Sequence, residues 1–152
     1  PFCGYNMADY FAHWLEMGPR IAHPPAIFHG NWFRTDTQGR FLWPGFGENI
    51  RVLKWILERV QGQGGAVEAP IGFIPTSDAL EMDGLRLPAG AIDELLRIDS
   101  GAWSAEQEEQ GLFFDRLAAR LPVQIRQEHE MLRQRLSRLS VAVNAAEPPH
   151  AP

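Results

Sequence analysis

The first strong pattern along the chain is an apolar stripe with helical spacing, formed by Met7, Tyr10, Phe11, Trp14 and Leu15. This i, i+3, i+4, i+7, i+8 spacing predicts a helix that buries one face. Asn6 is a suitable N-cap for it, and Gly18 with Pro19 ends the pattern.

After Pro24 and Pro25 the pattern changes to short extended runs. Residues 26–33 and 40–43 predict two strands, and the polar residues 35–39 predict the turn that joins them into a β-hairpin. Residues 44–49 form a loop by composition and lead into a helix. The apolar positions of this helix lie on one face, at Ile50, Leu53, Leu57 and Val60. Three glycines end it, Gly62, Gly64 and Gly65.

The second half of the chain is mainly helical in pattern. Residues 70–75 predict an extended segment, 77–82 a helical turn capped by Ser77, and 91–98 a short helix. Ser104 and Gln107 form a capping-box start for a helix that reaches Leu121. Pro122 then separates it from a last helix with apolar positions at 125, 132, 136 and 139, which predicts a helical hairpin. We expect residues 140–152 to be a disordered or vector-derived tail.

These elements predict an α+β fold, with a short β-hairpin, further strands and several packed helices. The 152 residues, of which 45% are hydrophobic and 22% charged, suit one packed domain. The formal charge of −5 argues against a protein that holds nucleic acid by bulk electrostatics. A single cysteine, no secretion signal and no long apolar run favour a cytoplasmic protein without a membrane span. Because the chain opens with Pro1 beside an aromatic cluster, we expect it to be a piece of a longer protein.

The candidate chemistry lies in residues 31–49, where five aromatic rings gather: Trp32, Phe33, Phe41, Trp43 and Phe46. Aromatic faces stack on nucleobases without requiring a particular hydrogen bond. Gly45 and Gly47 flank Phe46, which allows the backbone to turn sharply or to approach a ligand closely. The carboxamide of Asn49 can pair with the edge of guanine, but turned over it can face adenine equally well.

The same residues also admit a purely structural interpretation. Clustered Trp and Phe side chains commonly form core, as we expect for Trp43 and Trp14, and Asn49 can serve as a plain helix cap. Two alternatives therefore stand beside an enzyme: a purine-binding module without chemistry, and a structural helical domain. The structural domain requires Phe46 to be fully buried. For Arg34 and Asp36, a solvated turn pair is favoured over a phosphate clamp.

The sequence contains no catalytic or metal-binding motif that we can identify. No G-x-x-x-x-G-K-[ST] phosphate loop is present, and Lys54, the only lysine, lies on a predicted helix. The spacing of His13, His23 and His29 is not typical of a metal site. We therefore expect neither catalytic residues nor metal ligands in this chain.

A long run of residues resembles the guanine-binding segment of the GTP-dependent phosphoenolpyruvate carboxykinases. The run reads Asn31, Trp32, Phe33 and Arg34, then Asp36, Gly39, and Phe41 to Asn49 without a gap. The similarity continues upstream at residues 4–6, 10 and 12–15 and downstream at 70–72, 74–75 and 78–80. Beyond these it is looser, at Trp103, Leu121, Pro122 and residues 125–128.

The resemblance implies that residues 1–139 are the C-terminal portion of a larger α/β mononucleotide-binding domain, with the guanine pocket at about 31–49 and a helical region at 91–139. It assigns nucleotide contacts to Trp32, Phe33, Phe41, Phe46, Gly47, Glu48 and Asn49. The implied parent is a carboxy-lyase of gluconeogenesis, active as a monomer, that converts oxaloacetate and GTP into phosphoenolpyruvate, CO2 and GDP with Mn2+ or Mg2+ bound by residues outside this chain. The resemblance also implies that the piece alone is inactive.

Overall fold

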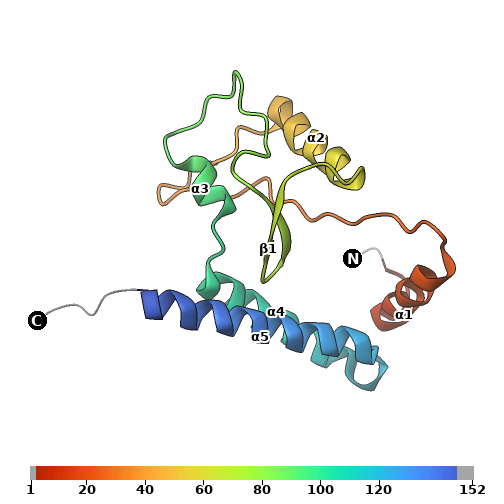
Figure 1. Cartoon of the computed structure of the whole chain (residues 1–152). Coiled ribbons are helices and arrows are strands. Elements are labelled where there is room, and N and C mark those ends of the chain that lie inside the picture. Colours follow the sequence, from red (N-terminus) through yellow and green to blue (C-terminus); the bar gives the residue numbers. More distant parts are fainter. Residues whose placement is uncertain (1–2, 147–152) are drawn as a thin grey trace, which may run out of the picture. The chain divides into compact units, whose positions relative to one another are not determined.

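The computed structural model describes residues 3–146 (Figure 1). The secondary structure is, in chain order, α1 (Met7–Met17), η1 (Gly18–Arg20), η2 (Phe46–Glu48), α2 (Asn49–Val60), β1 (Ala66–Ala69), β2 (Gly72–Pro75), α3 (Ala91–Leu96), α4 (Ser100–Leu117), η3 (Ala118–Arg120) and α5 (Val123–Ala146). The chain divides into two compact units, of which one contains α1, α4 and α5 and the other spans Ala26–Ile98. The small α+β fold is as predicted.

The helical unit is built around the hairpin of α4 and α5, which lie side by side in Figure 1. Leu136 of α5 is almost fully buried, at 1% exposed. The ring of Phe114 packs edge-on against His129, with centroids 5.2 Å apart, and also contacts Phe11 of α1. Nε2 of His129 lies 2.8 Å from the backbone oxygen of Gln107, so a polar contact joins the two long helices at this level.

The second unit surrounds α2 and the hairpin of β1 and β2. The two strands are antiparallel and pair Ala66 with Pro75 through to Ala69 with Gly72. Trp55 of α2 is buried, and its indole N–H donates to the backbone oxygen of Gly65 at 2.8 Å. Gly65 also packs closely against the segment after β2, since a Cβ there would lie 2.9 Å from Oγ1 of Thr76. Trp55 therefore anchors the hairpin to the helix.

Most of the predicted helices are confirmed. α1 begins after Asn6, whose side chain accepts the N–H of Ala8, and ends before Gly18. α2 ends at Val60, ahead of the three glycines. The helical hairpin is present, but α4 starts earlier than predicted because Asp99, rather than Ser104, caps it. α5 continues through Ala146, past the tail boundary predicted at residue 139, and residues 147–152 lie outside the described part.

Two predicted helical faces are more exposed than their patterns suggest. Tyr10, Trp14 and Leu15 of α1 are all exposed, so the prediction of one buried stripe, and of Trp14 as core, is wrong within the described residues. The apolar face of α2 is where we predicted it, yet it is 46–64% exposed. α2 instead buries Trp55 on its other side, against the hairpin. Periodicity locates an apolar face but does not supply the surface that covers it.

Neither of the two strands predicted before α2 is formed as a strand in the described chain. Residues 26–33 form no strand, because no neighbouring segment of the described chain offers them a ladder of hydrogen bonds. The predicted strand at 40–43 is reduced to one bridge between Thr35 and Phe41. Residues 77–82 form turns rather than a helical turn, while β1 was not predicted. No described helix is long and apolar enough to cross a membrane.

Candidate functional site

A tight turn brings two of the predicted aromatic residues together. The N–H of Asp36 donates to the oxygen of Arg40 at 2.9 Å, and the N–H of Leu42 donates to the oxygen of Arg34 at 2.9 Å. These bonds flank the bridge between Thr35 and Phe41 and place Phe41 next to Phe33. The two ring centroids are 6.1 Å apart with an interplanar angle of 61°. The rings remain 72% and 64% exposed, so they form an aromatic surface rather than a sealed core.

The carboxylate of Asp36 organises this turn from within. It accepts the backbone N–H groups of Gln38 and Arg40 at 2.8 and 3.0 Å, and the Nε of Arg40 at 2.9 Å. These bonds, above all the one from the Arg40 backbone, lower the pKa of the Asp36 carboxyl. Gly39 completes the turn with a φ of +77°, which a residue with a Cβ rarely adopts.

The loop that follows presents Phe46 to solvent. Gly45 has a φ of +85°, and its oxygen accepts the N–H of Glu48 at 2.8 Å to start the single turn of η2. This turn projects Phe46 outward, where its side chain is 98% exposed. A purely structural domain required Phe46 to be fully buried, and the structure contradicts that requirement. An exposed ring on a glycine-determined turn is available to stack on a flat ligand.

Asn49 stands at the junction of η2 and α2, and its backbone N–H donates to the oxygen of Phe46. In a 3-10 turn the side chains at positions i and i+3 lie on the same side. Phe46 and Asn49 therefore lie one turn apart along this segment.

Trp43 is part of the core, as predicted, and is only 5% exposed. Its indole Nε1 donates to Oδ1 of Asn49 at 2.9 Å. The sequence pattern does not reveal this hydrogen bond. The spacing of six residues gives no signal for it, since it depends on the path of the loop between them.

The remaining predicted residues lie around this cluster without ring contacts to it in the described chain. Trp32 is half-buried and packs against Gly30, where an added Cβ would lie 3.6 Å from the indole. Gly47 is exposed, and Glu48 forms an ion pair with Arg51 one turn further on. The structure therefore brings the rings of Phe33 and Phe41 into contact and leaves Phe46 exposed one turn before Asn49.

The expected turn pair of Arg34 and Asp36 is not formed. Asp36 pairs with Arg40, and Arg34 instead reaches the end of α3. There its NH1 donates to the backbone oxygens of Leu95 and Arg97 at 3.1 and 3.0 Å. Because helix ends leave carbonyl oxygens without partners, Arg34 acts as a C-terminal cap that ties the aromatic turn to α3.

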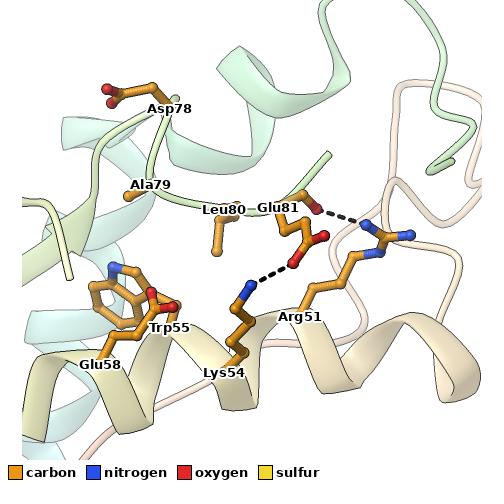
Figure 2. Close-up of a pocket in the computed structure, with 8 residues that line it drawn as sticks. All are labelled: Arg51, Lys54, Trp55, Glu58, Asp78, Ala79, Leu80 and Glu81. Atoms are coloured by element: carbon orange, nitrogen blue, oxygen red, sulfur yellow. Dashed lines mark hydrogen bonds and ion pairs between the residues drawn. The ribbon is translucent and has the colours of Figure 1, made fainter. Parts of the chain in front are cut away.

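A polar hollow of about 270 Å3 lies beside α2 (Figure 2). Lys54 forms an ion pair with the carboxylate of Glu81, and Arg51 donates to the Glu81 backbone oxygen at 2.8 Å. The bond between the two side chains raises the pKa of Lys54 and lowers that of Glu81. These contacts join α2 to the segment after β2. Because Lys54 and Arg51 are both paired with Glu81, the hollow offers no unpartnered cation to a phosphate group.

The described residues do not fit a metal ion. No group of three or more His, Cys, Asp or Glu side chains gathers in this part of the chain. A metal site built from protein side chains alone needs such a convergent donor set. No such site is found among the described residues, and no chemical step is assigned to a metal held by them.

Exposed rings on a glycine-containing turn, followed by an oriented carboxamide, are features typical of surfaces on which flat heterocycles stack. Comparison with known proteins gives the family: residues 1–135 match the one described as "Phosphoenolpyruvate carboxykinase C-terminal P-loop domain". The chain belongs to this family.

Named relatives agree with this family assignment. The chain is 48% identical to the phosphoenolpyruvate carboxykinase [GTP] of Neocallimastix frontalis, over 90% of this chain and 23% of the relative. It is 49% identical to the cytosolic enzyme of Bos taurus, over 91% of this chain and 22% of that protein, and 45% identical to the Treponema pallidum enzyme. The chain thus spans less than a quarter of the length of these relatives.

Proposed function

We propose that this chain supplies the guanine-nucleotide site of a GTP-dependent phosphoenolpyruvate carboxykinase. The observation that carries the proposal is the exposure of Phe46 on a turn whose backbone oxygen, at Phe46, accepts the N–H of Asn49. The relatives at 45–49% identity carry GTP in their names, which supports the choice of nucleotide. We assign nucleotide contacts to Trp32, Phe33, Phe41, Phe46, Gly47, Glu48 and Asn49.

In this site, affinity and selectivity come from different groups. Stacking on phenyl rings contributes about 1–3 kcal/mol per base and does not distinguish one base from another. Selection then requires directed hydrogen bonds at the edge of the base, and the Asn49 carboxamide follows the exposed ring one turn along the same segment. Phe33 and Phe41 offer a second aromatic surface on the preceding turn.

The whole enzyme, by this proposal, converts oxaloacetate and GTP into phosphoenolpyruvate, CO2 and GDP, a carboxy-lyase reaction of gluconeogenesis. The Mn2+ or Mg2+ that this chemistry uses does not fit the residues described here, and the chain alone is expected to be inactive. A cytoplasmic location is supported by the bovine relative that is named cytosolic. The formal charge of −5 supports a small-molecule ligand over nucleic acid, and we propose a monomeric enzyme.

The proposal is tested by titrating the 152-residue chain separately with GTP and ATP and following tryptophan fluorescence. We expect GTP to bind more tightly than ATP, and Asn49→Ala to reduce that preference. An equal response to both nucleotides in the unaltered chain would contradict the guanine assignment. No response to either nucleotide would contradict nucleotide binding by this chain.

A further inference from the structure

The hydrogen bond between Trp43 and Asn49 fixes which end of the Asn49 carboxamide faces the candidate site, which the sequence alone does not determine. A carboxamide has an acceptor end and a donor end, which differ little in shape. Read from sequence, either end of Asn49 can face the base, so either purine is acceptable. The structure adds a neighbour that distinguishes the two ends.

That neighbour is the indole Nε1–H of Trp43, which lies 2.9 Å from Oδ1 of Asn49. An indole N–H donates and never accepts. If the carboxamide turned over, its NH2 would face this N–H, so two donors would meet where only 5% of Trp43 is exposed and water has little access. A buried donor left without an acceptor costs about 1–3 kcal/mol, which favours the observed orientation about five- to 150-fold.

The donor end of Asn49 consequently points away from Trp43. In the described chain, the indole bond is the hydrogen bond that the Asn49 side chain makes, and no buried polar side-chain atom lacks a partner. The Nδ2 group is therefore open to a ligand. Asn49 follows the exposed ring of Phe46 by three residues, one turn along the same segment, so this donor is on the segment where a stacked base would lie.

We propose that Trp43 is a positioning residue of the base site: its indole N–H holds the Asn49 carboxamide with the donor outward and so selects a purine with oxygen, rather than an amino group, at position 6. This inference rests on the proposed function. Guanine has an acceptor at position 6, whereas adenine and 2,6-diaminopurine have a donor there. The 6-amino group of adenine or 2,6-diaminopurine is itself a donor, so it finds no acceptor at the Nδ2 group of Asn49.

The test uses base preference rather than affinity alone. GTP and 2,6-diaminopurine riboside triphosphate share the 2-amino group, ribose and phosphates and differ at position 6 and its adjoining N1. The ratio of their dissociation constants therefore cancels general losses of stability or phosphate binding. For the unaltered chain we expect a preference for GTP of about five- to 150-fold.

Two variants separate positioning from packing. Trp43→Phe keeps an aromatic ring but removes the N–H, so the carboxamide can turn over, and we expect the preference to fall toward unity. Asn49→Asp keeps an acceptor for Trp43 and replaces the outward donor with an acceptor, so we expect the preference to invert toward 2,6-diaminopurine. Asn49→Asp keeps the test decisive if Trp43→Phe fails to fold, because it leaves the buried indole in place.

The matched control is Gln63→Glu. This change introduces the same charge in the same unit, at an exposed residue that follows α2 and lies outside the candidate site. We expect the preference of this variant to match that of the unaltered chain. A general effect of added negative charge would alter it as much as Asn49→Asp does.

The outcomes distinguish the inference from the proposed function. If the unaltered chain prefers GTP and both variants keep that preference, the role of Trp43 is wrong and guanine binding stands. If Trp43→Phe lowers the preference, Asn49→Asp inverts it and Gln63→Glu leaves it unchanged, the inference is supported. If the unaltered chain binds neither nucleotide, the proposed function fails and the inference fails with it.

Discussion

Phe46→Ala separates a ligand-binding role from a structural one more sharply than any other single change in the chain. Phe46 is 98% exposed, so its ring contributes almost nothing to burial. Removing an exposed side chain away from special features usually changes the free energy of unfolding by less than about 0.5 kcal/mol. We therefore expect the variant to unfold at nearly the same urea concentration as the unaltered chain.

The same change should strongly affect nucleotide binding. A base that stacks on one ring loses about 1–3 kcal/mol when the ring is removed, which weakens binding about five- to 150-fold. For comparison, Leu42→Ala should show the opposite pattern. Leu42 is only 7% exposed, so its truncation should cost about 2–5 kcal/mol of unfolding free energy.

The assay combines urea unfolding followed by circular dichroism with GTP titration in a calorimeter. Phe73→Ala is the matched control, since Phe73 is 63% exposed in the same unit but lies on β2, outside the candidate site. We expect the control to bind GTP normally. If Phe46→Ala binds GTP like the unaltered chain, or unfolds as readily as Leu42→Ala, the interpretation of Phe46 as an exposed stacking surface is refuted.

Three further predictions concern conformation, packing and charge. Gly45→Ala should lower the free energy of unfolding by about 1–3 kcal/mol, because φ is +85° at this residue. Gly47→Ala should leave the melting temperature unchanged, because φ is not positive there and the added Cβ would lie in open space. Leu136→Ala should cost about 2–5 kcal/mol in urea unfolding, since the side chain is 1% exposed; a loss below about 0.5 kcal/mol would show that the helical hairpin is packed differently. Hydrogen bonds from Arg133 and then Gln134 lower the pKa of Glu130 from 4.5 to about 2, so its contribution to stability should be complete above about pH 4.5 and be lost as the pH falls through about 2. Carbon-13 NMR of the carboxyl group should show this pKa, and Arg133→Gln should raise it; an unchanged value would contradict the pairing.

The helices could be predicted from the sequence because their signals are local. The Asn6 cap and the Gly18 stop define α1 without reference to any other segment, and Pro122 divides α4 from α5 in the same way. Strands depend on partners, which a single sequence does not identify. Residues 26–33 have the composition of a strand, but no pairing partner is present in the described chain, and β1 was missed although it pairs with the extended segment that we predicted.

In the candidate site, too, local features could be predicted and contacts between distant residues could not. The clustering of rings and the glycines around Phe46 could be recognised in the sequence, and so could the carboxamide of Asn49. The sequence indicates only in part which rings are buried. Trp43 is buried as predicted, whereas Trp14, which we also expected in the core, is exposed. The hydrogen bond from Trp43 to Asn49 and the attachment of Arg34 to α3 could not be predicted, because both depend on how loops return through space.

The most direct measurement of the central claim is the proton NMR spectrum of GTP in the presence of the chain. A guanine stacked on an aromatic face lies in the ring current of that face, so we predict an upfield shift of its H8 signal that grows with protein concentration. Phe46→Ala should remove most of this shift, and Phe73→Ala should preserve it. An H8 signal that stays at its free position while the chain is folded would contradict the claim that these exposed rings hold a purine.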